Sequence, residues 1–139
     1  VGLFVQSSDK EQLRVCHRCF ELEKKLGMPV IPSVTVKQIE NGTQQLEELT
    51  GKCRHWQITA PASEKNESHR IERTSAAVSV LKKMMCRINL DRSIDLEFLK
   101  AMNYKPNAIT IGRGLLKAPD LMDGTVESLL AVLRDKSKG

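Results

Sequence analysis

The sequence predicts an all-α fold, a compact bundle of about five to six helices in one domain spanning residues 1–139. Apolar residues recur at spacings of three and four along most of the chain, as they do on the buried face of a helix. Residues that cap helices precede several of these stretches, and glycine or proline separates them. No repeat of about 20–50 residues recurs, which excludes a solenoid of stacked units.

A first helix is expected over residues 8–26. Ser8 followed by Glu11 forms a capping-box pattern, in which two side chains bind free amide groups at a helix start. Gly27 is suited to the left-handed conformation that ends many helices, and Pro29 lies just beyond it.

The second helix is expected to begin at Pro32-Ser33. Its apolar positions follow the same rhythm as far as Trp56. Asn41-Gly42 interrupts the pattern, because glycine inside a helix costs about 1 kcal/mol relative to alanine. The stretch can therefore form one long helix or two shorter ones.

Residues 57–69 are polar, contain a proline and hold few large apolar groups. This composition predicts a long, exposed and flexible loop. A third helix is expected to follow it, with Ile71, Val78, Leu81, Met85 and Ile88 on one face.

A fourth helix is expected after a cap at Asp91 or Ser93, ending near residues 103–107. A short fifth helix is expected over residues 107–117. Residues 109–111 are partly β-branched, so an extended conformation is the alternative there.

Pro119 is expected to close the fifth helix. The last helix then starts at Asp123-Gly124-Thr125 and turns its leucines inward. Basic residues in its tail suit the carboxyl end of a helix.

The composition is that of an ordinary globular domain, with 40% hydrophobic and 28% charged residues. No apolar run approaches the roughly 20 residues of a membrane span, and the first residues do not resemble a signal peptide. We therefore expect no membrane span and an intracellular protein, cytoplasmic or nuclear. The net charge of +5 is spread along the chain, which permits nucleic-acid binding but does not indicate a concentrated site.

The four cysteines leave two environments open. Their even number and two glycosylation sequons, at Asn41 and Asn66, are compatible with a secreted, disulfide-bonded protein. Cys16, Cys53 and Cys86 fall on apolar faces of the expected helices, where free cysteine behaves as a small hydrophobic residue. We favour reduced thiols.

Metal binding and catalysis find little support. The Cys16-x-x-Cys19 pair needs two further ligands to hold zinc, and Cys53 and His55 are the weak candidates. The same pair lies within a helix and not at a helix start after a strand, which disfavours redox chemistry. No nucleophile–base set or paired carboxylates emerge, so we expect no enzyme, no metal and no cofactor.

Binding of a partner is therefore the expected function. Methionine surfaces adapt to varied apolar segments, and a groove between helices could accept a partner helix or short apolar peptide. The residues expected to line it are Met84, Met85, Phe98 and Met102. The alternative is a basic helical domain that binds nucleic acid through Lys82, Lys83, Arg87 and Arg92. The partner's identity and the oligomeric state stay open.

The second half of the chain also resembles one helical family in its residue pattern. Val78, Leu81, Met84 and Ile88, followed by Ile111, Leu115, Val126 and Leu130, are similar to the bundle shared by the amino-terminal domain of elongation factor TFIIS and the integrase-binding domain of LEDGF. The family's tryptophan in the last helix has no counterpart. The resemblance implies docking of short disordered segments from transcription proteins.

Overall fold

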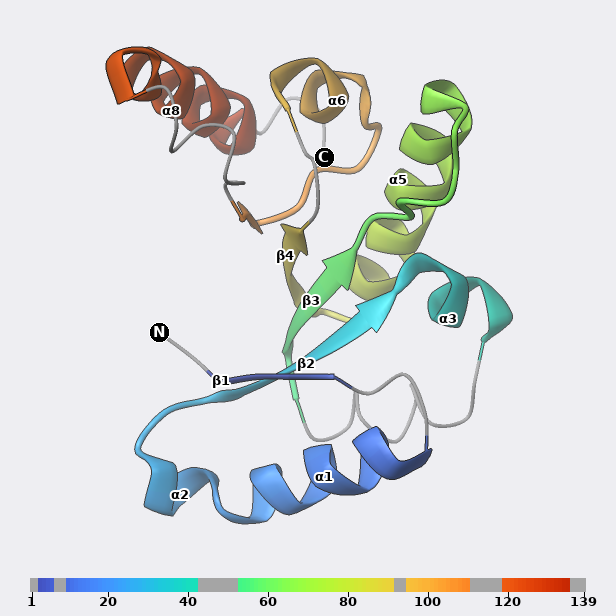
Figure 1. Cartoon of the computed structure of the whole chain (residues 1–139), viewed down its shortest axis with the longest axis vertical. Helices are drawn as coiled ribbons and strands as arrows, with labels where there is room; N and C mark the ends of the chain where they lie inside the picture. Colours follow the sequence, from blue (N-terminus) through green and yellow to red (C-terminus); the bar gives the residue numbers. More distant parts are fainter. Residues whose placement is uncertain (1–2, 7–9, 43–52, 92–94, 111–118, 136–139) are drawn as a thin grey trace.

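The computed structural model describes residues 3–6, 10–42, 53–91, 95–110 and 119–135 (Figure 1). It is an α/β fold in which helices alternate with the strands of an all-parallel sheet, so the expected all-α bundle is wrong. The strands are β1 (Leu3–Gln6), β2 (Val30–Thr35), β3 (His55–Thr59), β4 (Arg87–Asp91) and β5 (Ala108–Ile109). The helices are α1 (Lys10–Glu21), α2 (Glu23–Leu26), α3 (Val36–Asn41), α5 (Glu67–Lys83), α6 (Leu96–Ala101) and α8 (Pro119–Arg134).

The strands pair in the order of the sequence, β1-β2-β3-β4-β5, and every pair is parallel. Parallel neighbouring strands are joined by crossover connections, which are almost always right-handed. When each crossover leads to the next strand in the same direction across the sheet, the connecting helices lie on the same face of the sheet. Figure 1 shows α1 beside β1 and β2, α3 beside α5, and α6 beside α8. None of the helices in these ranges has the length and apolar character that a bilayer crossing demands.

One face of the sheet forms the core with the helices. Trp56 and Ile58 of β3 alternate with polar neighbours, as do Ile88 and Leu90 of β4, so all four side chains point to the same face. They are fully buried in one cluster with side chains of the helices, among them Cys16, Val78, Leu81, Phe98 and Leu99.

The opposite face carries a row of hydrogen-bonded polar side chains. Gln57 donates from Nε2 to Ser33 Oγ at 3.3 Å, and Asn89 donates from Nδ2 to Gln57 Oε1 at 3.0 Å and to Thr110 Oγ1 at 2.9 Å. The row links side chains from β2, β3, β4 and the residue after β5. It satisfies the buried Asn89 amide and opposes any slip in strand register, which would break all three bonds.

The first expected helix is confirmed over most of its length but is divided into α1 and the short α2, and its expected cap at Ser8 lies outside the described residues. Gly27 ends α2 with a φ of 65°, in the left-handed region that glycine adopts without strain. The break considered at Asn41-Gly42 is also confirmed, because α3 ends there and Gly42 has a φ of 59°. The cap of α3 is Thr35, whose side chain forms a capping box with Gln38.

The helix expected from Pro32-Ser33 to Trp56 is wrong at both ends. Its first residues lie in β2 and its last in β3. Buried parallel strands are short apolar runs, and over so few residues their spacing does not differ from that of a buried helix.

The loop expected at residues 57–69 is shorter than predicted. Residues 57–59 complete β3, with Ile58 buried, and residues 67–69 open α5. Asn66 caps α5 by accepting a hydrogen bond from the His69 amide at 3.1 Å. Only residues 60–66 connect the two elements.

The third helix is confirmed as α5, but two residues of its expected apolar face lie outside it: Met85 follows the end of α5 with an exposed side chain, and Ile88 belongs to β4. The fourth is α6, which is capped by Asp95 and not by Asp91 or Ser93. In place of a helix from residue 107, Ala108–Ile109 form β5, in line with the extended alternative. Residues 111–117 lie outside the described ranges. The last helix is α8, which begins at Pro119 and not at Asp123, since proline suits the first helical position. Of its leucines, Leu129 is buried as expected, whereas Leu130 is 38% exposed.

These corrections also remove the family resemblance, because the residues that carried it do not form a helical bundle. Ile88 is part of the sheet, and Ile111 and Leu115 lie outside the described residues. Docking of disordered transcription segments is therefore no longer implied.

Removing the Asn89 amide is predicted to lower the free energy of unfolding. Asn89→Ala leaves Gln57 and Thr110 without the amide donor that bonds them, which should cost about 1–3 kcal/mol. Urea unfolding followed by circular dichroism measures it. Asn103→Ala, at an exposed asparagine, is the control and should change little. Equal stability of the two variants would show that the polar row contributes nothing.

Candidate functional site

The end of α5 holds the one described non-glycine residue with a positive φ, Met85 at 62°. The Cys86 amide donates to the Leu81 carbonyl at 3.1 Å, and the Met85 amide donates to the Lys82 carbonyl at 3.0 Å. These two bonds define a Schellman motif, in which the left-handed residue is usually glycine. A side chain in that conformation costs about 1–2 kcal/mol.

The local sequence explains why the chain turns here. Leu81 and Cys86 are both buried, and an apolar pair at these positions commonly accompanies a Schellman motif. Since β4 begins at Arg87, the chain must leave the helix and enter the sheet within three residues. The turn leaves the Met85 side chain outside the fold.

Three apolar side chains are exposed together at this end of α5. Met85 is 77% exposed, Met84 39% and Val80 40%. Val80 and Met84 are four residues apart and therefore share one face of the helix. We call Val80, Met84 and Met85 the methionine patch.

Four basic residues lie near the methionine patch in the chain or across the sheet. Lys82 and Lys83 lie in the last turn of α5, where they also complement the negative end of the helix dipole. Arg54 donates from Nη1 to the Met84 carbonyl at 3.3 Å, and its own carbonyl accepts from the Arg87 amide at 2.6 Å. We call Arg54, Lys82, Lys83 and Arg87 the basic rim. Partial burial lowers the pKa of Lys82.

His55 sits beside the basic rim, at the start of β3. It pairs in register with Arg87 of β4. Burial, and after it the positive charge of Arg87, lower the pKa of His55 from its usual 6.5. A neutral imidazole at pH 7 therefore adds no further charge to the rim.

The four residues expected to line one groove lie in two places. Met84 and Met85 are in the methionine patch, whereas Phe98 and Met102 are each 1% exposed within the core. Arg70, near the start of α5, stacks over the Phe98 ring at 4.7 Å. Fourteen residues of helix, roughly 21 Å, separate Arg70 from Met84. The described residues therefore do not form the predicted groove.

Of the four residues expected to bind nucleic acid, Lys82 and Lys83 lie in the last turn of α5 and Arg87 begins β4, three residues after α5 ends. Arg92 lies outside the described residues. Sequence reasoning missed Arg54, because it placed the residues around it in a helix. The alternation of Trp56 and Ile58 with polar neighbours was the signal that could have placed Arg54 next to a strand.

All four cysteines are free thiols, and three of them are buried. Burial first, then Cys19 and Cys53, raise the pKa of Cys16 to about 11. Within the described ranges, no three histidine, cysteine or acidic side chains are grouped closely enough to hold a metal ion. The weak zinc candidates Cys16, Cys19, Cys53 and His55 are thus not assembled into a site.

Comparison with known proteins adds no assignment to this geometry. No family model matches the chain, and no curated protein matches its sequence.

Acidification is predicted to weaken the fold through His55. Its pKa is lower in the folded than in the unfolded protein, so its contribution is complete above about pH 6.5 and is lost as the pH falls through the unfolded value. Urea unfolding between about pH 7.5 and about pH 5.5 measures the slope. His55→Gln should flatten this part of the profile; an unchanged slope would show that His55 does not contribute.

Cys16 is predicted to stay unmodified in the native protein. With a pKa of about 11 its thiol is protonated near neutral pH, and the thiol form reacts poorly. Alkylation with and without denaturant, mapped by mass spectrometry, should label Cys16 only after unfolding. Cys19, which is partly exposed, is the internal comparison. Native labelling of Cys16 as fast as Cys19 would contradict the assignment.

Proposed function

We propose that this chain is a non-enzymatic protein-binding α/β domain that docks an acidic, apolar peptide segment of a partner on the methionine patch and basic rim. The observation that carries the proposal is Met85, a strained residue whose side chain is 77% exposed. This function is compatible with an intracellular protein, cytoplasmic or nuclear, that keeps its thiols reduced.

The strain at Met85 is not offset within the described fold. Glycine at this position would avoid the cost of a left-handed side chain. A methionine that is mostly in water gains little from packing, so nothing in the surrounding structure favours it over glycine. Burial of the Met85 side chain against a partner would supply the packing energy that it lacks in water. Strained residues are common at binding sites for this reason.

The neighbours of Met85 favour an apolar contact. Single exposed hydrophobic residues are ordinary on protein surfaces, but here Val80 and Met84 are one helical turn apart and Met85 is the next residue in the chain. Methionine side chains are flexible and polarisable, so they adapt to more than one apolar partner.

The positive charge of the basic rim favours a partner segment that carries acidic side chains. Arg54, Lys83 and Arg87 would attract Asp and Glu side chains placed between the apolar anchors of a peptide. Complementary charge speeds encounter and excludes basic segments, while the apolar contacts supply most of the affinity.

Nucleic acid is the alternative occupant, and the clustering of Lys82, Lys83 and Arg87 favours it. Phosphate groups would contact the basic rim, and affinity would fall steeply with salt. Contacts to phosphate do not need the Met85 side chain. Dependence on Met85 therefore separates the two occupants.

Met85→Gly is predicted to stabilise the protein and to abolish peptide binding. Relief of the strain is partly offset by the greater freedom of glycine in the unfolded chain, which leaves a gain of about 0.5–1 kcal/mol. Peptides selected from a phage-displayed random library against the wild-type protein should be rich in acidic and large apolar residues. Fluorescence anisotropy then compares their affinity for the two proteins.

Matched variants test each part of the surface. Lys83→Glu should weaken peptide binding, whereas Lys65→Glu, which changes the net charge equally in the loop before α5, should not. Val15→Ser removes an exposed apolar group from α1 and should also leave binding intact. Failure to select such peptides, or equal binding to Met85→Gly, would contradict the proposal. Oligonucleotide binding that survives Met85→Gly would favour nucleic acid instead.

A further inference from the structure

A second candidate site lies at the other end of the sheet. A hollow of about 390 Å³ opens where β2 and β3 end, between the start of α3, residues 60–63 and α5. Ligand pockets in proteins commonly span about 300–1,000 Å³. In parallel α/β folds, ligands bind beyond the carboxyl ends of the strands, which is where this hollow lies.

The polar side chains that line the hollow are three hydroxyl groups, which can donate or accept hydrogen bonds, and two cations, which only donate. Thr59, the last residue of β3, pairs in register with Thr35, the last residue of β2. Lys37 of α3, Ser63 of the connection before α5 and Arg73 of α5 also line the hollow. No carboxylate is among the described lining residues. The side chains of Lys37, Thr59 and Ser63 make no hydrogen bond or ion pair within the described part of the chain.

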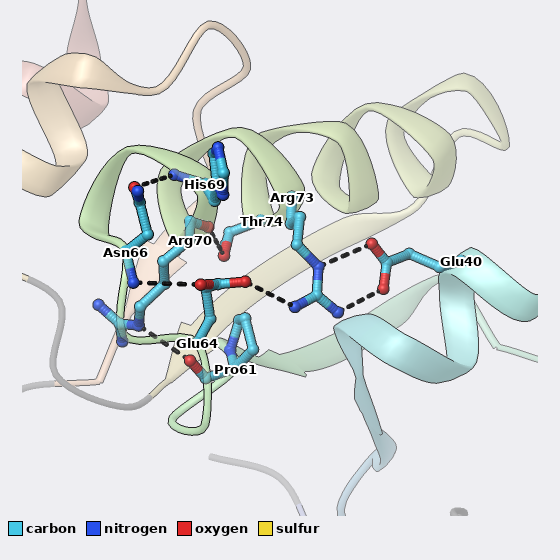
Figure 2. Close-up of polar contacts among 8 residues, drawn as sticks. All are labelled: Glu40, Pro61, Glu64, Asn66, His69, Arg70, Arg73 and Thr74. Carbon is cyan, nitrogen blue, oxygen red and sulfur yellow. Dashed lines mark hydrogen bonds and ion pairs between the residues drawn. The ribbon is translucent and has the colours of Figure 1, made fainter.

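Arg73 is held in place by two acidic side chains (Figure 2). Its Nε and Nη2 donate to the two oxygens of Glu40, at 2.9 and 2.6 Å. Its Nη1 lies 3.6 Å from Glu64. The hydrogen bond from Arg73 lowers the pKa of Glu40, so the pair stays ionised near neutral pH. The guanidinium is therefore oriented before any ligand arrives.

These contacts leave donors on Arg73 for a ligand. A guanidinium carries five N–H groups, and the bonds to Glu40 and the contact with Glu64 engage three of them. Glu64 is itself fixed, because it accepts a hydrogen bond from the Asn66 amide at 3.1 Å. Figure 2 also shows Arg70 reaching the Pro61 carbonyl, at 3.2 Å, which ties the loop to α5.

We infer that this hollow binds a phosphate group, either free or at the end of a small organic molecule. A phosphate is rich in acceptors and negatively charged, which matches a wall of hydroxyl, ammonium and guanidinium donors. Lys37 supplies a charge and Thr59 a hydroxyl, neither of which has a partner among the described residues, and Arg73 supplies an oriented guanidinium. The site is separate from the methionine patch, so it is independent of the proposed peptide binding.

Titration with inorganic phosphate, followed by NMR of the backbone amides, tests this inference. Shifts should be largest at residues around Lys37, Thr59 and Ser63 and should saturate. Lys37→Gln and Thr59→Val should each weaken binding by about tenfold, the effect of losing one hydrogen bond to a charged group. Glycerol phosphate tests the second source of the same group, and tighter binding than phosphate would identify an organic phosphate as the ligand.

Lys65→Gln, in the same loop but outside the hollow, is the matched control and should bind as the wild type. Met85→Gly should also leave phosphate binding unchanged, so the two proposals can fail separately. Equal shifts with chloride at the same ionic strength would overturn the inference. So would shifts confined to Lys82, Lys83 and Arg87, or unchanged affinity in both Lys37→Gln and Thr59→Val.

Discussion

The parallel ladder between β3 and β4 constrains the rest of the molecule. Five residue pairs match from His55–Arg87 to Thr59–Asp91, so both strands begin and end together. A connection between them must return from the carboxyl edge to the amino edge, which requires a crossover as long as α5. The buried side chains of α5 then cover Trp56 and Ile58, which gives the sheet its core face. The amide groups of Gln57 and Asn89 occupy the other face and pair with one another.

The same ladder places both proposed sites. At the amino edge, α5 must turn into β4 within three residues, and the Schellman motif that achieves this exposes Met85. At the carboxyl edge, β3 must turn into α5, and residues 60–66 make that turn beside the hollow. The cost at Met85, about 1–2 kcal/mol, is tolerable because burying a single large apolar side chain contributes about 1.5–3 kcal/mol. The fold can therefore keep a strained residue where it is useful.

Charge is distributed differently at the two edges. The basic rim gathers side chains from α5, β4 and the residue before β3, close to the negative end of the α5 dipole. At the hollow, Glu40 and Glu64 form ion pairs with Arg73. In the proposed site, Arg73 therefore contributes oriented hydrogen-bond donors as much as positive charge. The buried thiols of Cys16 and Cys53, whose pKa values burial raises, take no part in either site.

Local signals in the sequence determined two helix ends and several residue environments. Gly27 and Gly42 end helices, α5 follows its apolar spacing, Cys16 is buried, and Met84 and Met85 share one surface. The strands were not predicted, because Val30–Thr35 and His55–Thr59 are too short for the spacing of their apolar residues to be distinguished from that of a helix. What makes them strands is pairing with residues far along the chain, such as Trp56 with Ile88. Only that pairing brings Arg54 to Met84 and Lys37 towards Arg73, because contacts between distant segments depend on the whole fold and not on neighbouring residues.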